Sequence, residues 1–205
     1  MNLPEPPLLV ISDGRQAERP LEEVAEAVFA GGCRWFSLRE KHLPAAERRA
    51  LLSRLVLLGR GWGATVTVHD DLEAAAMTGA GGVHLPGGGN PEVTRTRLPD
   101  GLIGVSAHSG DEAAALLACG ADYATLSPVF LSASKPGYGP ALGLDGLADA
   151  VARVSGPLVA LGGVSAANAP SCLAAGARGV AVMGEVMRAT DPRAAVETIL
   201  AAICG

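Results

Sequence analysis

Polar side chains that could handle an anion or a proton stand where short apolar runs of the sequence end. Arg39 and Lys41 flank Glu40 directly after WFSL, and Ser106 and His108 close the run LIGVSAH. Because side chains alternate along a strand, Arg39 and Lys41 are predicted to share one orientation while Glu40 points the other way. A histidine in a cationic site can take up a proton and return it, so His108 is a candidate general acid/base. The alternative is a histidine that caps the following helix or lies satisfied in the core.

A second group of residues is suited to binding an anion. Gly162, Gly163 and Gly184 end the runs PLVAL and GVAVM, and backbone N–H groups at such glycines can hold a phosphate. Lys135 lies in the loop SASKPGYGP beside Ser132 and Ser134, which gives a flexible cation with hydroxyls next to it. The competing interpretation is that the glycines only permit tight turns and that the lysine is solvated.

The elements that must position these residues alternate along the chain. Short, β-branched runs predict eight strands, at 8–13, 35–40, 65–70, 82–86, 102–108, 123–130, 157–163 and 179–186. Helical spacing is clearest at 21–30, 45–59, 111–120, 166–176 and 194–203. Strict β–α alternation without a linker predicts one domain over residues 1–205, an α/β fold of the (β/α)8 TIM-barrel type. A doubly wound sheet is the alternative, but the turn SDGRQ lacks the GxGxxG fingerprint. In such a barrel the site lies at the carboxyl ends of the strands.

Composition and charge exclude several classes of protein. The net charge is −5, and the 16 Lys and Arg residues are scattered, which disfavours binding to nucleic acid or to an anionic membrane. No apolar stretch approaches the roughly 20 residues that span a bilayer, and MNLPEPP lacks a basic leader. The four cysteines show no CxxC spacing, so we expect reduced thiols, no thiol nucleophile and a cytoplasmic protein. His69 and Asp70 diverge as neighbours on a strand and make a weak metal pair.

The motifs, taken in order, have a known counterpart. FSLREK, VHDD, GGVHLP, GVSAHS, SPVFLSASK, ALGGV and GVAVMGEV together resemble the thiamin-phosphate synthase/TenI family over nearly the whole chain. The resemblance implies a (β/α)8 barrel that acts on a thiazole phosphate in thiamin biosynthesis. Family barrels are often dimers or larger, so it also implies a homo-oligomer.

Departures from the family pattern distinguish its two branches. Synthases join a pyrimidine diphosphate to a thiazole phosphate, and their pattern reads QLREK, ND and GQED, with two aspartates for Mg2+. Here Ser37 stands at the Gln position, His69 at the Asn position and Gly89 at the second Asp position, so only Asp70 remains of the metal pair. One carboxylate is a poor Mg2+ site when a diphosphate must be held. LPGGG is closer to the LPSGS of the TenI branch, whose members isomerise an alkylidene thiazole carboxylate phosphate without metal.

The resemblance therefore favours a thiazole tautomerase that needs no cofactor. It implies that His108 moves the proton, and that Gly162, Gly163, Met183 and Gly184 hold the phosphate with help from Lys135, Ser132 and Ser134. Arg39, Lys41 and Ser106 would orient the carboxylate or line the pocket. Two alternatives stay open. A divergent synthase would need Mg2+ at Asp70 with a loop acid such as Asp71 or Glu92 as second ligand, and a catalytically silent thiazole-phosphate-binding protein would act in regulation.

Overall fold

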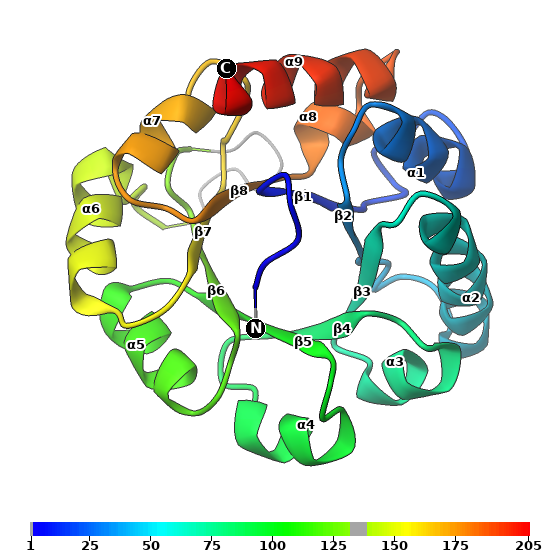
Figure 1. The fold of residues 1–205 in the computed structure, drawn as a ribbon, viewed down its shortest axis with the longest axis horizontal. Coiled ribbons are helices and arrows are strands. Elements are labelled where there is room, and N and C mark those ends of the chain that lie inside the picture. Colours follow the sequence, from blue (N-terminus) through cyan, green and yellow to red (C-terminus); the bar gives the residue numbers. More distant parts are fainter. Residues whose placement is uncertain (1, 132–138) are drawn as a thin grey trace.

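The eight apolar runs form the strands of a closed parallel barrel (Figure 1). The structure is a computed structural model and describes residues 2–131 and 139–205. The strands follow one another around the barrel, and β1 closes the ring by pairing with β8. The predicted (β/α)8 barrel is confirmed, and the doubly wound alternative is wrong. The strands are β1 (Leu8–Ile11), β2 (Trp35–Leu38), β3 (Thr65–His69), β4 (Gly82–Leu85), β5 (Leu102–Ala107), β6 (Tyr123–Leu126), β7 (Leu158–Leu161) and β8 (Gly179–Val182).

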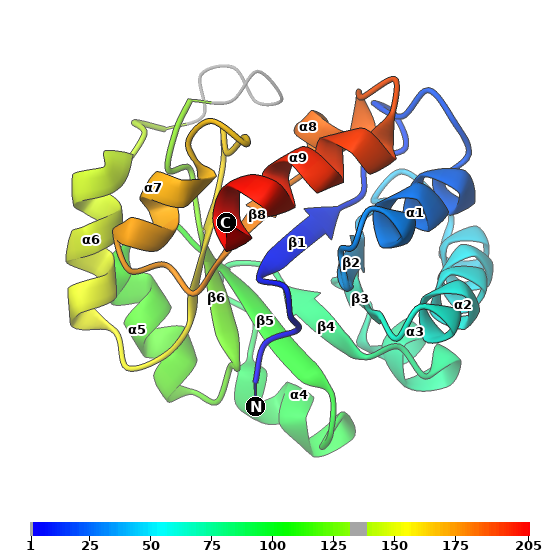
Figure 2. The ribbon, with the colours of Figure 1, turned by 45° about the horizontal axis from the view of Figure 1, so that its top comes forward.

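Helices surround the barrel and separate successive strands (Figures 1 and 2). All five predicted helices are present, and the one expected at 21–30 has those bounds. The structure adds α3, α4, α6 and α8, which are short or rich in Gly and polar residues. The helices are α1 (Leu21–Ala30), α2 (Ala45–Gly61), α3 (Leu72–Thr78), α4 (Pro91–Arg97), α5 (Gly110–Ala118), α6 (Gly143–Arg153), α7 (Ala169–Ala174), α8 (Gly184–Met187) and α9 (Pro192–Cys204).

Side-chain caps fix where several of these helices begin. Asp71, Asn90, Ser109 and Asp191 each accept a hydrogen bond from the backbone N–H three residues further on, at the starts of α3, α4, α5 and α9. Such a cap satisfies one of the N–H groups that a helix start leaves without an intrahelical partner. The caps therefore set the lengths of the loops in which the strand-end residues lie.

The apolar residues form two layers. The larger cluster lies between the strands and the helices, while a smaller one fills the barrel interior with Leu9, Trp35, Tyr123 and their neighbours. The rings of Trp35 and Tyr123 meet edge to face, with centroids 4.8 Å apart. Leu3 packs against this inner cluster, and the N-terminal segment crosses the middle of the barrel in Figure 1. Apolar side chains thus fill the barrel interior, and the space for a cavity lies at the carboxyl ends of the strands.

The cysteines behave as the sequence predicts. All four are free thiols, with Cys33 and Cys172 buried and the other two exposed. Burial raises the pKa of the Cys33 thiol to about 12, so that sulfur stays protonated and unreactive at neutral pH. Within the described ranges, the structure has no helix long and apolar enough to cross a membrane.

Candidate active site

A cavity of about 350 Å³ opens at the carboxyl ends of the strands. Its wall contains residues at or just after the carboxyl ends of all eight strands, and it brings together predicted site residues that are far apart in sequence. Ser132, Ser134 and Lys135 lie outside the described residues. The other predicted positions all line this one cavity: Arg39, Lys41, Asp70, Ser106, His108, Gly162, Gly163, Met183 and Gly184.

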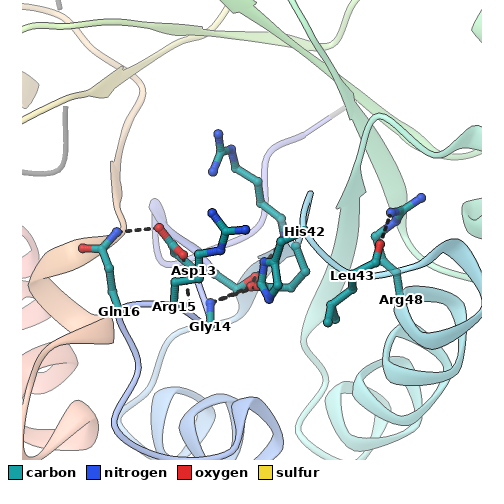
Figure 3. Close-up of polar contacts among 10 residues, drawn as sticks. Asp13, Gly14, Arg15, Gln16, His42, Leu43 and Arg48 are labelled. Atoms are coloured by element: carbon teal, nitrogen blue, oxygen red, sulfur yellow. Dashed lines mark hydrogen bonds and ion pairs between the residues drawn. The ribbon is translucent and has the colours of Figure 1, made fainter.

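The end of β2 sends its charged side chains to opposite sides. Arg39 and Lys41 line the cavity, whereas Glu40 is only 1% exposed and points into the β1–α1 loop. The Ser12 hydroxyl donates to Glu40 at 2.6 Å, and the Gly14 N–H donates to both carboxylate oxygens at 3.0 Å. His42 lies beside this carboxylate, with Nδ1 3.5 Å from Oε2 (Figure 3). The predicted alternation is confirmed, and Glu40 has a structural role in holding the loop.

The two cations at this strand end differ in their partners. Lys41 Nζ lies 2.7 Å from an oxygen of Asp70, so a carboxylate already offsets its charge. The Arg39 guanidinium forms no ion pair with any described residue. Its backbone N–H donates to the Ser12 hydroxyl at 2.8 Å, which fixes the start of its side chain. Arg39 is therefore the better placed of the two to bind an anionic ligand.

His108 stands at the exposed rim of the cavity after β5. Its Nδ1 is 2.8 Å from the carbonyl oxygen of Ser127. Since a carbonyl only accepts, Nδ1 must carry the hydrogen, and the lone pair of the neutral ring is on Nε2. Ser109 caps α5 by accepting from the Glu112 N–H, and the Glu112 carboxylate accepts from the backbone N–H of His108 at 2.8 Å. Ser109, and not His108, is thus the helix cap, and the core alternative for His108 is also wrong.

A chain of buried polar groups lies beneath His108. The Ser106 hydroxyl is 3.0 Å from His84 Nε2, and His84 Nδ1 is 3.0 Å from the Tyr123 hydroxyl. Burial lowers the pKa of His84 to about 4, and it lowers the pKa of the neighbouring His69 well below its ordinary value. Both imidazoles are therefore neutral at pH 7. His84 is buried and hydrogen-bonded, and it also contributes to the cavity wall.

The glycines after β7 are needed for close packing. Gly162 and Gly163 have φ of 94° and 63°, which L side chains rarely adopt. A Cβ on Gly162 would lie 2.8 Å from the Pro128 Cα, and one on Gly163 would lie 2.5 Å from the Leu131 carbonyl oxygen. Asn168 holds the turn by donating to the Gly163 carbonyl at 2.9 Å. Both residues must therefore be glycine for the turn to form, and their backbone lies at the cavity wall. That they bind phosphate stays a prediction.

Sequence reasoning missed one cation of the cavity, Arg188. It lies four residues after Gly184, and residues four apart share one face of a helical turn. Its guanidinium occupies the space beside Gly184, because an added Cβ there would lie 2.1 Å from Nη1. That spacing from a strand-end glycine is the signal by which Arg188 could have been found.

Comparison with known proteins identifies the family. The sequence model described as thiamine monophosphate synthase matches residues 8–186. The chain belongs to this family. A thiamine-phosphate synthase of Methanoculleus marisnigri is 42% identical, over 86% of this chain and 85% of that protein. A thiamine-phosphate synthase from a Roseiflexus species is 36% identical, over 95% of this chain and 84% of that protein. The solved thiamine phosphate pyrophosphorylase of Pyrococcus furiosus is 33% identical, with a TM-score of 0.86 over 96% of this chain and 94% of that one.

The synthase pattern of the thiamine monophosphate synthase family requires a Mg2+ site, and the residues here fit one poorly. Asp70 is engaged with Lys41, and Gly89 offers no side chain. A Cβ on Gly89 would lie 2.7 Å from the Leu85 Cβ, so the local backbone also resists an aspartate. Among the residues that the structure describes, no three His, Cys, Asp or Glu side chains are grouped to hold a metal ion.

Neither loop acid supplies the missing ligand. Asp71 caps α3 and pairs with Arg48 at 2.7 Å. Although partial burial disfavours its charged form, hydrogen bonds from Arg48 and the Ala74 N–H lower the pKa of Asp71. Glu92 is exposed on α4, and neither residue lines the cavity. Ser37, at the Gln position, is buried and accepts a hydrogen bond from Thr67 at 2.8 Å, so it does not face a ligand either.

Proposed function

We propose that this member of the thiamine monophosphate synthase family is a metal-independent thiazole tautomerase. The observation that carries the proposal is the orientation of His108, whose Nδ1–H is held by the Ser127 carbonyl at the cavity rim. The neutral ring therefore has a basic Nε2. A general base needs this arrangement, in which one nitrogen is fixed by a carbonyl and the other can receive the proton.

The reaction is a proton shift that leaves the atoms of the substrate otherwise unchanged. His108 Nε2 removes the proton from the ring carbon that bears the carboxylate, and the electron pair of that C–H bond moves into the ring. The exocyclic double bond becomes a ring double bond, and the imidazolium returns the proton to the exocyclic carbon. Base and acid are thus one residue used twice.

Other cavity residues would orient the two anionic groups of the substrate. Arg39, which forms no ion pair with a described residue, binds the carboxylate, and the Ser106 hydroxyl, held by His84, donates to the same group. Backbone groups at Gly162, Gly163, Met183 and Gly184 would receive the phosphate, because they line the cavity on the β7–β8 side. Lys41 supports the carboxylate end through its pair with Asp70, and Lys135, Ser132 and Ser134 remain proposed contacts of the phosphate.

A Mg2+-dependent thiamin-phosphate synthase is the second candidate. The names of relatives at 36% and 42% identity favour it, whereas the donor set around Asp70 and Gly89 disfavours it. A non-catalytic thiazole-phosphate-binding protein is the third, and only turnover measurements separate it from the first.

One experiment distinguishes the three functions. The purified protein is incubated either with the alkylidene thiazole carboxylate phosphate alone in EDTA, or with pyrimidine diphosphate, thiazole phosphate and Mg2+. Isomerisation is followed by the absorbance of the aromatic thiazole, and condensation by thiamin-phosphate fluorescence after oxidation. We expect isomerisation that EDTA does not reduce. Thiamin phosphate formation that requires Mg2+ would contradict the proposal, and ligand binding without either product would favour the regulatory function.

A further inference from the structure

The cavity has a second cationic end at α8, on the other side of β1 from Arg39. Arg188 lines the cavity together with Gly162, Gly163 and Gly184. Its guanidinium lies against the Gly184 backbone, where even a methyl group would be in contact with Nη1. A side chain at position 184 would therefore displace the guanidinium from its present place at the cavity wall.

The β1–α1 loop holds the arginine from the opposite side. Arg188 Nη1 donates to the side-chain oxygen of Gln16, and the Gln16 amide nitrogen donates to Asp13 at 2.5 Å. Figure 3 shows Gln16 and Asp13 facing one another, with Gln16 next to the orange ribbon of the α8 region. The Asp13 carboxylate accepts from the amide nitrogen, so the amide oxygen is directed toward Arg188. The Arg15 N–H donates to the other Asp13 oxygen at 3.2 Å and keeps that carboxylate in place.

The charges of the cavity fit a ligand with two anionic ends. Among the described residues, the cations Arg39, Lys41 and Arg188 line it together with the carboxylates Asp70 and Glu185, in a chain whose net charge is −5. Lys41 pairs with Asp70, Arg39 lies at one end of the cavity, and Arg188 lies at the other end, with Glu185 three residues before it in the chain. The guanidinium has five N–H donors in a planar fork that matches phosphate oxygens, and the bond to Gln16 fixes the direction of this fork.

We infer that Arg188, oriented by Gln16 and Asp13, is the side chain that binds the phosphate monoester of the ligand. The inference deepens the proposed function and rests on it only for the phosphate-bearing ligand. Arg188 adds charge and direction to a site whose other donors are neutral backbone groups. Gln16 acts through Arg188 as a positioning residue, and ligand binding couples the β1–α1 loop to α8.

Binding measurements test this inference without turnover. Dissociation constants are measured by calorimetry for inorganic phosphate, for a thiazole alcohol and for its phosphate ester. The proteins are the full-length chain and the variants Arg188→Ala, Arg188→Lys and Gln16→Met. The affinity ratio between ester and alcohol isolates the contribution of the phosphate group. We expect Arg188→Ala to lower this ratio by about tenfold or more and to lower the affinity for inorganic phosphate by a similar factor. The affinity for the thiazole alcohol should not change. Arg188→Lys should have a higher affinity ratio than Arg188→Ala. Gln16→Met should have a ratio between those of the unmodified chain and Arg188→Ala.

The control is Arg193→Ala, which removes the same charge from the outer helix α9, where Arg193 pairs with Glu197 at 2.7 Å. Its phosphate affinity should equal that of the unmodified chain. The inference is overturned if the unmodified chain does not bind phosphate, or if Arg188→Ala leaves the ratio unchanged while lowering the melting temperature. Phosphate binding that depends on Arg188 in a protein without tautomerase turnover would support the inference and refute the proposed function.

Discussion

Single side-chain atoms determine what each polar residue of the cavity can do. His108 uses Nδ1 to donate to Ser127, Asp70 is occupied by Lys41, and Glu40 is buried among the donors of the β1–α1 loop. Of the three, His108 is the residue that we propose as the base. The two carboxylates satisfy cations or N–H groups of the protein itself, which is why neither is proposed as a base.

At this scale we predict the effect of removing the proton acceptor. His108→Asn should lower tautomerase kcat by about 10²–10⁴-fold with a small change in KM, because general acid/base help is lost while the anion-binding groups remain. Steady-state kinetics measure both constants. His42→Asn is the matched control, since His42 lies beside Glu40 outside the cavity, and its kcat should be unchanged. Full activity of the His108 variant would show that another group moves the proton.

At the scale of elements, the polar groups beneath the site depend on how β5 and β6 fit together. Gly104 and Tyr123 are partners in the register of these two strands. The Tyr123 ring lies over Gly104, where an added Cβ would be 2.1 Å from Cζ. The glycine therefore lets the ring enter the barrel and bring its hydroxyl to His84, which in turn holds Ser106.

Gly104→Ala should destabilise the protein by about 1–3 kcal/mol, because overpacking forces the ring or a strand to move. The free energy of unfolding is measured by urea titration. Gly61→Ala is the control, since nothing lies within 4 Å of a Cβ added there and alanine favours a helix, so its stability should stay equal or rise. Equal stability of the two variants would contradict the packing described for Tyr123.

At the scale of the whole molecule, barrel closure buries two imidazoles next to one another. The rings of His69 and His84 are 4.5 Å apart, and Nε2 of His69 is buried without a hydrogen-bond partner among the described residues. Burial disfavours protonation of both rings, and each ring's charge would also oppose that of the other. The folded barrel thus excludes protons that the unfolded chain binds. Two further properties of the whole molecule stay predictions, namely its assembly as a homo-oligomer and its location in the cytoplasm.

Stability should consequently fall in mild acid. The pKa of His84 is about 4 in the folded protein and near 6.5 when the chain is unfolded, and that of His69 is also lowered. Between these values the unfolded state binds more protons, so the free energy of unfolding decreases as the pH falls from about 6.5 toward 4. Urea titrations at pH 7.5, 6, 5 and 4.5 measure the slope. His84→Gln should reduce it, and an unchanged slope would mean that His84 titrates normally.

The sequence by itself determined the barrel and much of the candidate site. Periodicity identified the strands, and the alternation around Glu40 placed Arg39 and Lys41 on the cavity side, because both properties depend on local backbone geometry. Gly89 likewise indicated a poor metal site, because the resemblance to the synthase pattern places a metal-binding aspartate at that position. Only the tertiary structure decided which charges meet. Arg188 and Gln16 lie 172 residues apart and come together because β8 pairs with β1. The pairing of Lys41 with Asp70 and the tautomer of His108 also depend on neighbouring strands, and no local pattern encodes such contacts between them.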